Sequence, residues 1–229
     1  MKVTLERIEN IAPHTQTFWF AAERSVNYIA GQFVELVLPH DNPDDRGIKR
    51  WFTLSSSPSE KLLAITTKFS TKSSSFKAAL QALTPGSTLN LSDPMGDFVL
   101  PKNKANPLVF CAGGIGVTPF RSMAKQLIDD SEADSRNIST YYGVRTLGDA
   151  CFKPELSEVG TLNIVLSEPS AQWKGLTGYI SAEMLVKDQP KTAMYYIAGP
   201  EQMVEKLYKE LQAIGISKQK IVGDYFPGY

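Results

Sequence analysis

The pattern of apolar residues changes at a polar stretch bounded by prolines, residues 101–107. Before this stretch, apolar and polar residues alternate in short runs that Gly, Pro and Asn interrupt, which is typical of an antiparallel barrel. After it, continuous apolar runs alternate with segments of helical periodicity, which favours a parallel sheet covered by helices on both faces. The sequence therefore predicts two domains, 1–101 and 107–229.

The spacing of apolar residues predicts a separate set of elements for each domain. In the first, strands are expected at residues 2–9, 15–21, 32–38, 51–55, 62–68 and 88–91, with one helix at 73–83. In the second, strands are expected at 108–112, 138–143, 162–166 and 194–198, and helices at 117–128 and 202–214. Right-handed crossovers would join the parallel strands.

The composition argues against several classes of function. With 24 basic and 24 acidic side chains, no overall field attracts nucleic acid or an anionic membrane. The two cysteines, Cys111 and Cys151, are too few for an iron–sulfur cluster. His14 and His40 lack other ligands at metal-binding spacing, so we expect exposed loop histidines and no metal site. There is no apolar signal core and no run near the ~20 residues of a membrane span, so we expect a cytoplasmic protein.

One predicted strand carries an unusual set of side chains: Arg50, Trp51, Phe52 and Thr53. Successive side chains of a strand face opposite ways, so Trp51 and Thr53 share one face while Arg50 and Phe52 share the other. A guanidinium beside an aromatic edge suits a ring system attached to a phosphate. An ordinary edge strand has the same periodicity, so the strand alone leaves both interpretations open.

Two features after this strand suit phosphate groups. The serines at 73–75 stand at the start of the expected helix, where Ser74 and Ser75 would bind an anion or simply cap the helix. Lys68 is a candidate phosphate ligand because it lies shortly before this cluster.

Glycine-rich turns follow two buried strands of the second domain. The first turn reads AGGIGVTP over residues 112–119 and opens a helix, so that backbone amides can approach a diphosphate. It departs from GxGxxG because Pro119 replaces the last glycine, and proline is favoured in the first turn of a helix. The second turn is Gly199-Pro200-Glu201. Because parallel strands end at one edge of the sheet, two turns suited to ligands are expected there.

In their order along the chain, these motifs resemble the ferredoxin–NADP reductase superfamily, and the resemblance covers essentially all of the residues. It implies a six-stranded antiparallel FAD-binding barrel followed by a parallel-sheet NAD(P)-binding domain. The family's Arg-x-aromatic-Ser/Thr motif is matched by Arg50, Phe52 and Thr53. By this resemblance, Arg50 binds the FAD diphosphate, Phe52 packs on the isoalloxazine ring and Thr53 lies within hydrogen-bond reach of flavin N5. Trp51 is expected at the same FAD site.

The same resemblance assigns the other motifs. Ser74 and Ser75 match a phosphate-binding element of the FAD domain, although the family usually has glycine where this chain has Thr71. The residues similar to the NAD(P) diphosphate turn are Gly113, Gly114, Gly116, Thr118 and Pro119, and those similar to the turn near nicotinamide are Gly199, Pro200 and Glu201. Ala198 stands where plant-type members have cysteine, so positioning and not a thiol would assist hydride transfer.

The last residues, 224–229, resemble the family's tail that reaches back over the flavin. Family tails often carry glutamate there, and Asp224, one methylene shorter, is a candidate for proton relay. Phe226 is expected beside the flavin or, equally, as an aromatic residue that seals the domain interface.

Two residues give opposing signals on the coenzyme. Arg145 is able to accept the 2′-phosphate of NADPH, to serve an adenosine diphosphate, or to pair with Asp149. Glu168 stands where phosphate-binding members often have arginine, and its charge would repel a 2′-phosphate. We therefore expect a slight preference for NADH over NADPH.

The expected activity is hydride transfer between NAD(P)H and FAD, with electrons passed to a ferredoxin, a flavodoxin, an oxygenase component or a small acceptor. The alternative is an electron-transfer subunit that works only inside a larger redox complex. Any iron–sulfur cluster would then belong to a partner. A binding module that has lost catalysis is disfavoured, because the motifs are all present.

Overall fold

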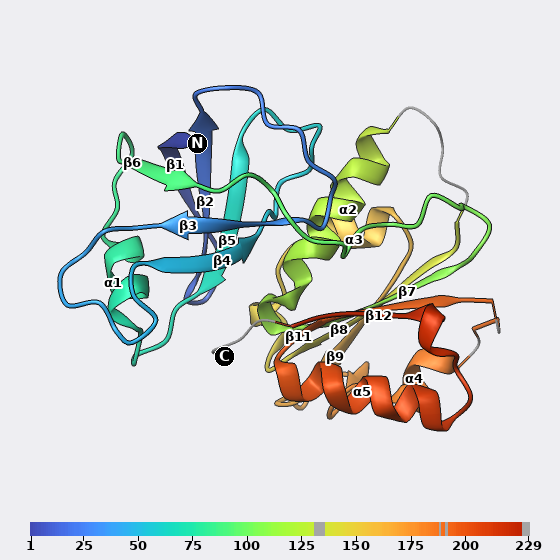
Figure 1. Ribbon diagram of the computed structural model, residues 1–229. Helices are drawn as coiled ribbons and strands as arrows, with labels where there is room; N and C mark the ends of the chain where they lie inside the picture. The colour runs from blue at the N-terminus through green and yellow to red at the C-terminus, as the bar shows by residue number, and fades with distance from the viewer. Residues whose placement is uncertain (131–135, 188, 191, 226–229) are drawn as a thin grey trace.

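The computed structural model describes residues 1–130, 136–187, 189–190 and 192–225. Its first half is an antiparallel sheet of six strands: β1 (Lys2–Ala12), β2 (Thr15–Ala22), β3 (Phe33–Val37), β4 (Lys49–Thr53), β5 (Leu63–Lys68) and β6 (Thr88–Leu91). The strand order is β4-β3-β6-β1-β2-β5, and a bridge between Leu54 and Ile65 connects the two edges. The sheet closes into the barrel that the alternating pattern predicts (Figure 1).

Apolar side chains fill the barrel, and a short helix closes one end of it. The largest fully buried side chains in this half are Phe18, Phe20, Phe76, Leu5, Leu36, Leu54 and Ile65. Phe76 belongs to α1 (Ser75–Gln81) and packs on Phe52 of β4, with ring centroids 6.1 Å apart. Burying an aromatic side chain of this kind stabilises the fold by about 1.5–3 kcal/mol, so α1 ties β4 to the barrel core.

The second half is a parallel sheet of six strands: β7 (Leu108–Gly113), β8 (Ile138–Val144), β9 (Thr161–Leu166), β10 (Leu176–Thr177), β11 (Met194–Gly199) and β12 (Ile221–Tyr225). The strand order is β10-β9-β8-β7-β11-β12. The helices α2 (Thr118–Asp129) and α3 (Lys153–Glu158) cover one face, and α4 (Ala182–Val186) and α5 (Glu201–Ala213) cover the other (Figure 1). All of β7 is buried, as expected for a strand between two layers of helices.

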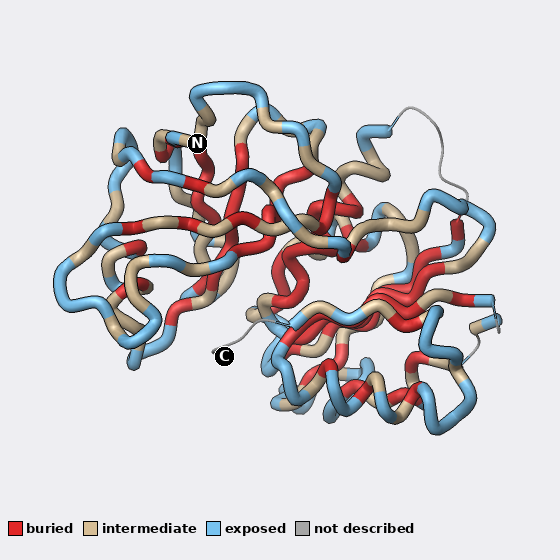
Figure 2. The backbone as a smooth tube through the Cα atoms, in the orientation of Figure 1, coloured by how far each residue is buried: buried red, intermediate tan, exposed pale blue. Residues whose placement is uncertain are grey.

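Each face of this sheet has its own apolar core. The core under α2 and α3 includes Phe120 and Leu156, and the core under α4 and α5 includes Leu185 and Leu207. Figure 2 shows that buried residues concentrate along the central strands. The carboxyl ends of β7, β8 and β11 are thereby fixed at one edge of the sheet.

The segment that leaves the barrel packs directly on the second domain. The ring of Phe98 lies 5.7 Å from that of Phe120 and 5.4 Å from that of Tyr196. The hydroxyl of Tyr196 donates a hydrogen bond of 3.0 Å to the carbonyl of Val99. These edge-to-face contacts and the hydrogen bond join the two halves beside β7.

The predicted fold class is confirmed, whereas four elements of the second half have no counterpart in the prediction: β10, α3, α4 and β12. Three of them have six residues or fewer and β10 has two, so each offers too few positions for a periodic signal. The boundaries 1–101 and 107–229 stay a prediction. No helix in the described part of the chain has the length and apolar character needed to cross a membrane.

Candidate functional site

A cavity of about 540 Å³ lies against β4, between the two halves of the chain. We call it the β4 cavity. Its lining includes the β4 residues Arg50, Trp51, Phe52 and Thr53, and from the second half Ile115, Thr118, Asp224 and Tyr225. The structure therefore gathers the strand motif, part of the glycine turn and the start of the predicted tail around one space.

Thr53 has the feature most expected of a ligand-binding residue in this cavity. The residue is 3% exposed, and its hydroxyl has no hydrogen-bond partner among the described residues. Leaving a buried hydroxyl unpaired costs about 1–3 kcal/mol, a cost that a ligand atom in the cavity would remove. Thr53 thus fits a bound ring system with a polar edge.

The alternation predicted for β4 is present. Phe52 is 8% exposed and stacks on Phe76, and the guanidinium of Arg50 lies 4.9 Å from the same Phe76 ring. Trp51 is 61% exposed and packs against Phe33. Phe52 lines the cavity although its ring lies against the barrel core, so its packing on a flavin stays a prediction, and Trp51 is the more exposed aromatic residue of β4.

The guanidinium of Arg50 is held in place by the loop that precedes β4. Nη1 donates to the carbonyls of Arg46 and Gly47, at 3.0 Å each, and Nη2 pairs with the carboxylate of Asp44 at 2.5 Å. The hydrogen bond from Arg50 is the main cause that lowers the pKa of Asp44. The loop thus presents a fixed cation at the rim of the cavity, as a phosphate ligand requires.

The serine cluster caps α1. Ser74 is the N-cap, and its hydroxyl accepts from the backbone N–H of Lys77. The hydroxyl of Ser75 accepts from the backbone N–H of Asp44 and lies 3.1 Å from Nε2 of His40. His40 is therefore half-buried against α1, which corrects its prediction as an exposed loop residue. Phosphate binding by Ser74 and Ser75 stays a prediction.

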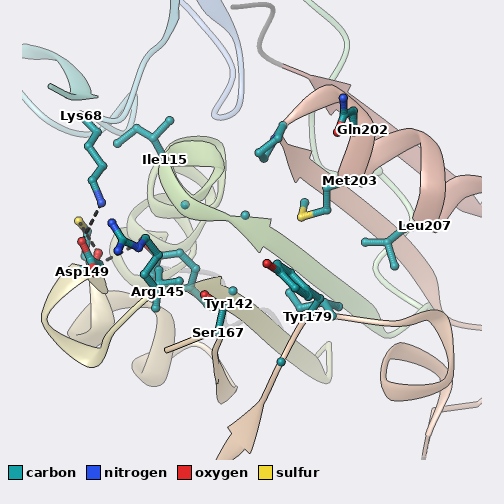
Figure 3. A pocket seen from close by; sticks show the side chains of 18 of the residues that line it. Lys68, Ile115, Tyr142, Arg145, Asp149, Ser167, Tyr179, Gln202, Met203 and Leu207 are labelled. Carbon is teal, nitrogen blue, oxygen red and sulfur yellow. Dashed lines mark hydrogen bonds and ion pairs between the residues drawn. The ribbon is translucent and has the colours of Figure 1, made fainter. Parts of the chain in front are cut away.

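A second cavity, of about 460 Å³, lies at the carboxyl ends of β7, β8 and β11 (Figure 3). We call it the turn cavity. It is lined by residues of the glycine turn, Gly113, Gly114 and Ile115, and by Pro200, Met203 and Lys206 from the second turn and α5. Ile115 lines both cavities, so the two spaces meet at the glycine turn.

Glycine is required in this turn by close packing. A Cβ atom on Gly116 would collide with the backbone carbonyl of Ala198, whereas one on Gly113 would meet the flexible end of the Met203 side chain. Gly114 has φ of +53°, a left-handed conformation that favours glycine. A 3₁₀ turn, Gly114–Val117, then leads into α2, so backbone N–H groups border both cavities.

The remaining turn residues take up the expected positions around these glycines. Thr118 begins α2, with Pro119 in the first helical turn, and its hydroxyl donates to the carbonyl of Ile115. Gly199 ends β11, close to Gly113. Pro200 lines the turn cavity, and Glu201 begins α5 with an exposed side chain. The direct roles of these residues toward a coenzyme stay predictions.

Two ion pairs flank the turn cavity, and Figure 3 shows the pair formed by Lys68 and Asp149. Arg145 pairs with Glu168 through bonds of 3.0 and 2.9 Å, and this hydrogen bonding raises the pKa of Arg145 and lowers that of Glu168. Asp149, the partner considered for Arg145, instead accepts from Nζ of Lys68 at 2.7 Å. The structure therefore pairs Arg145, whose charge favours NADPH, with Glu168, whose charge favours NADH.

The side chain of Lys68 lines the turn cavity, and its carbonyl accepts a hydrogen bond from Lys77 of α1. Lys68 ends β5 and reaches Asp149 across the boundary between the two halves. Binding of an FAD phosphate by Lys68 stays a prediction. Its side chain is placed to meet a ligand of the turn cavity.

Asp224 pairs in register with Ala198, between β12 and β11, and lines the β4 cavity. Burial raises the pKa of its carboxyl to about 6, partly offset by a hydrogen bond from the backbone N–H of Tyr225. A carboxyl with this pKa gains and loses a proton near neutral pH, which fits the proton relay predicted for it. Phe226 lies outside the described residues.

Known proteins are similar to this chain in sequence or in fold. The model of the oxidoreductase NAD-binding domain family matches residues 110–209. The flavohemoprotein of Oceanobacillus iheyensis is 29% identical over 149 residues, 62% of this chain and 36% of that protein. One component of the Na(+)-translocating NADH-quinone reductase of Pseudomonas paraeruginosa is 31% identical over 161 residues, 64% of this chain and 39% of that component. The chain thus spans less than half the length of these relatives.

Solved structures match nearly the whole chain. The Amycolatopsis cytochrome P450 reductase GcoB has a TM-score of 0.85 at 23% identity, covering 99% of this chain and 70% of that one. A ferredoxin NADP+ reductase from Neisseria gonorrhoeae, with bound FAD and NADP, has a TM-score of 0.81 at 19% identity, covering 98% of both chains. The chain therefore has the fold of these reductases, and its residues 110–209 match the oxidoreductase NAD-binding domain family.

The superfamily motifs do not include several cavity residues that the structure reveals. Tyr179, 82% exposed, Met203 and Lys206 line the turn cavity, and Thr66 lines the β4 cavity. Met203 and Lys206 lie in the first turns of α5, directly after the second glycine turn, and this proximity is the signal that would have identified them. Tyr179 and Thr66 carry no such signal, because tertiary packing alone brings them to the cavities.

Proposed function

We propose that this chain is an FAD-dependent oxidoreductase that transfers hydride between NAD(P)H and FAD and passes the electrons to an acceptor. The observation that carries the proposal is that the β4 cavity and the turn cavity meet at Ile115. A flavin ring in the first and a nicotinamide reaching from the second would then be neighbours. When bound, FAD supplies the hydride and electron chemistry.

The residues of the β4 cavity would bind and orient the flavin. Arg50 supplies a fixed guanidinium for the diphosphate, and the unpaired hydroxyl of Thr53 supplies a hydrogen bond to the polar edge of the ring. Trp51 covers a ring face. Asp224, with a pKa of about 6, holds or releases a proton at its carboxyl oxygen.

The residues of the turn cavity would bind the coenzyme. The amides of residues 113–118 and the start of α2 favour a diphosphate. The carboxylate of Glu168 accepts two hydrogen bonds from the guanidinium of Arg145 and places a negative charge beside it. We therefore propose NADH as the preferred coenzyme. A 2′-phosphate would have to displace Glu168 and lie next to its charge.

The acceptor is proposed to be a ferredoxin, a flavodoxin, an oxygenase component or a small molecule. A subunit of a larger redox complex is a second candidate, favoured by the match to a component of an NADH-quinone reductase. Size-exclusion chromatography of the protein in native extract separates the two. Elution near 25.3 kDa favours a free enzyme, and elution in a larger assembly favours the second candidate. The cytoplasmic location stays a prediction from the sequence.

The test of the donor half is anaerobic addition of NADH to the FAD-loaded protein, followed by visible absorbance. Bleaching of the oxidised flavin band is expected, and faster with NADH than with NADPH. A band that persists with both coenzymes contradicts the proposed function. If the protein retains no FAD after loading and gel filtration, the proposed function is contradicted already at the step of FAD binding.

A further inference from the structure

Arg121, on α2, is a buried cation at the boundary between the two halves. Its side chain is 8% exposed, and Nη1 donates to the carbonyl of Ser55 at 3.0 Å. Both Nη atoms donate to the carboxylate of Glu60, and a carboxylate oxygen of Glu155 lies 3.4 Å from Nε. Two carboxylates thus match the charge of this buried guanidinium, although its Nε has no hydrogen-bond partner among the described residues.

The next residue of α2 extends the connection. The hydroxyl of Ser122 donates to the carbonyl of Ser56, so two successive carbonyls after β4 are bound by two successive residues of α2. The hydroxyl of Ser56 accepts from the backbone N–H of Ala64 and lies 2.9 Å from the hydroxyl of Tyr28. The end of β4 is thus fixed both to α2 and to the rest of the barrel.

These bonds lie directly behind the two cavities. Ser55 is two positions after Thr53, which lines the β4 cavity and whose hydroxyl has no partner among the described residues. Arg121 is three positions after Thr118, where α2 begins at the glycine turn. Because a strand and a helix are stiff over such short distances, a shift of Arg121 against Ser55 would move Thr53 relative to the turn.

We propose that Arg121 is a positioning residue: with Glu60 and Ser55 it sets the separation between the strand end that carries Thr53 and the glycine turn. The inference rests on the proposed function, in which a displacement of ~1 Å between the reacting groups costs ~10²-fold in rate. Lysine would keep the charge of Arg121 but not its planar fork of donors. Arg121→Lys therefore loosens the clamp without leaving Glu60 and Glu155 unpaired.

The first readout needs no cofactor. Spin labels at Glu6→Cys and Lys209→Cys, exposed positions on β1 and α5, report the separation of the two halves by pulsed electron resonance; Cys111 and Cys151 are buried. A narrow distance distribution is expected for the labelled parent, and a broader one for Arg121→Lys. The control is Ser59→Ala, which removes a hydrogen bond of 2.6 Å to Asp129 across the same boundary but outside the clamp. It should keep the narrow distribution.

The second readout is the limiting rate of flavin bleaching at saturating coenzyme. Arg121→Lys should lower this rate by ~10-fold while the dissociation constants of FAD and coenzyme change by less than ~3-fold. Ser59→Ala should leave it unchanged. Glu60→Gln is the second variant if Arg121→Lys does not fold, and the same two changes are expected of it.

A distance distribution in Arg121→Lys as narrow as that of Ser59→Ala overturns the proposal, as does an unchanged limiting rate. A purely structural role would lower the unfolding temperature and leave the rate of the folded, FAD-loaded fraction unaltered. If the parent is bleached by neither NADH nor NADPH, the proposed function fails, and the distance measurement still decides whether Arg121 fixes the two halves.

Discussion

The two cavities that meet at Ile115 are built in different ways. The β4 cavity takes its chemical groups from side chains: a guanidinium, an unpaired hydroxyl, an exposed indole and a half-buried carboxyl. The turn cavity borders the glycine turn, which lies at the ends of parallel strands and has no room for a Cβ atom at Gly116. One cavity should therefore be damaged by removing atoms and the other by adding them.

Gly116→Ala tests the turn cavity and carries the largest expected effect. The added Cβ meets the carbonyl of Ala198, which cannot move without shifting β11. We expect a loss of about 3 kcal/mol in the free energy of unfolding, measured by urea denaturation. Gly148→Ala is the matched control, because its Cβ would have its nearest neighbour 3.8 Å away. Equal effects of the two changes would show that close packing of the turn does not shape this cavity.

Asp224→Asn tests the half-buried carboxyl of the β4 cavity. Burial raises its pKa from 3.8 to about 6 in the folded protein, so the folded state binds the proton more tightly than the unfolded state. The carboxyl of Asp224 therefore contributes fully to the free energy of unfolding below pH ~4, and this contribution is lost as pH rises through about 6. At pH 8 the asparagine variant should be more stable than the parent by up to about 3 kcal/mol, and at pH 4 by nothing.

The measurement for Asp224 is urea denaturation of the cofactor-free protein at both pH values. Asp45→Asn, an exposed position, controls for the loss of one negative charge and should show no such pH-dependent gain. A constant difference between Asp224→Asn and the parent at pH 4 and pH 8 would show that the carboxyl is not desolvated in the cavity.

The same comparison shows what could be predicted from the sequence. The run 108–112, the glycines that follow it and the alternation in 50–53 are local patterns, and the barrel, the parallel sheet and both strand–turn motifs follow from them. The pairs Lys68–Asp149 and Arg121–Glu60 join residues 81 and 61 positions apart. They depend on how the two halves pack, so no local pattern predicts them, nor the position of Lys68 at the turn cavity.

Short elements were missed for a related reason. β12 alternates from buried Ile221 to exposed Tyr225 over five residues, and its resemblance to a flavin-covering tail suggested no strand there. It forms because β11 offers an edge to pair with. α3 begins after Phe152, whose φ of +56° is unusual for a residue other than glycine. Tertiary contacts thus determine β12 and α3, for which local propensity gives no clear prediction.

Thr53→Val tests whether the β4 cavity depends on a single hydroxyl. Valine keeps the shape of threonine and removes its hydrogen bond, so FAD should stay bound while flavin reduction slows by ~10-fold, or about 1.4 kcal/mol. Thr67→Val is a close control: Thr67 is also a buried β-strand threonine with an unpartnered hydroxyl among the described residues, and it does not line the cavity. Stopped-flow absorbance measures both. Reduction of Thr53→Val at the parent rate removes Thr53 from the hydride step.

Glu168→Gln carries the smallest expected effect. It sharpens the comparison because it tests whether side chains at the rim of the turn cavity select the coenzyme. The Arg145–Glu168 pair is exposed, 68% and 56% for the two side chains, so breaking it costs at most about 1 kcal/mol of stability. Freed of Glu168, Arg145 can meet a 2′-phosphate, and the catalytic efficiency with NADPH relative to NADH should rise by ~10-fold.

Two further variants identify the source of that gain. Glu205→Gln removes the same charge from an exposed pair on α5 and should leave the coenzyme ratio unchanged. Adding Arg145→Gln to Glu168→Gln should abolish the gain, because no guanidinium then faces the phosphate. If the double variant keeps the improved NADPH ratio, the preference comes from removing repulsion alone and Arg145 does not bind the phosphate. If Glu168→Gln leaves the ratio of catalytic efficiencies with NADPH and NADH unchanged, the side chains at the rim do not select the coenzyme. The backbone of the turn would then determine the choice between NADH and NADPH.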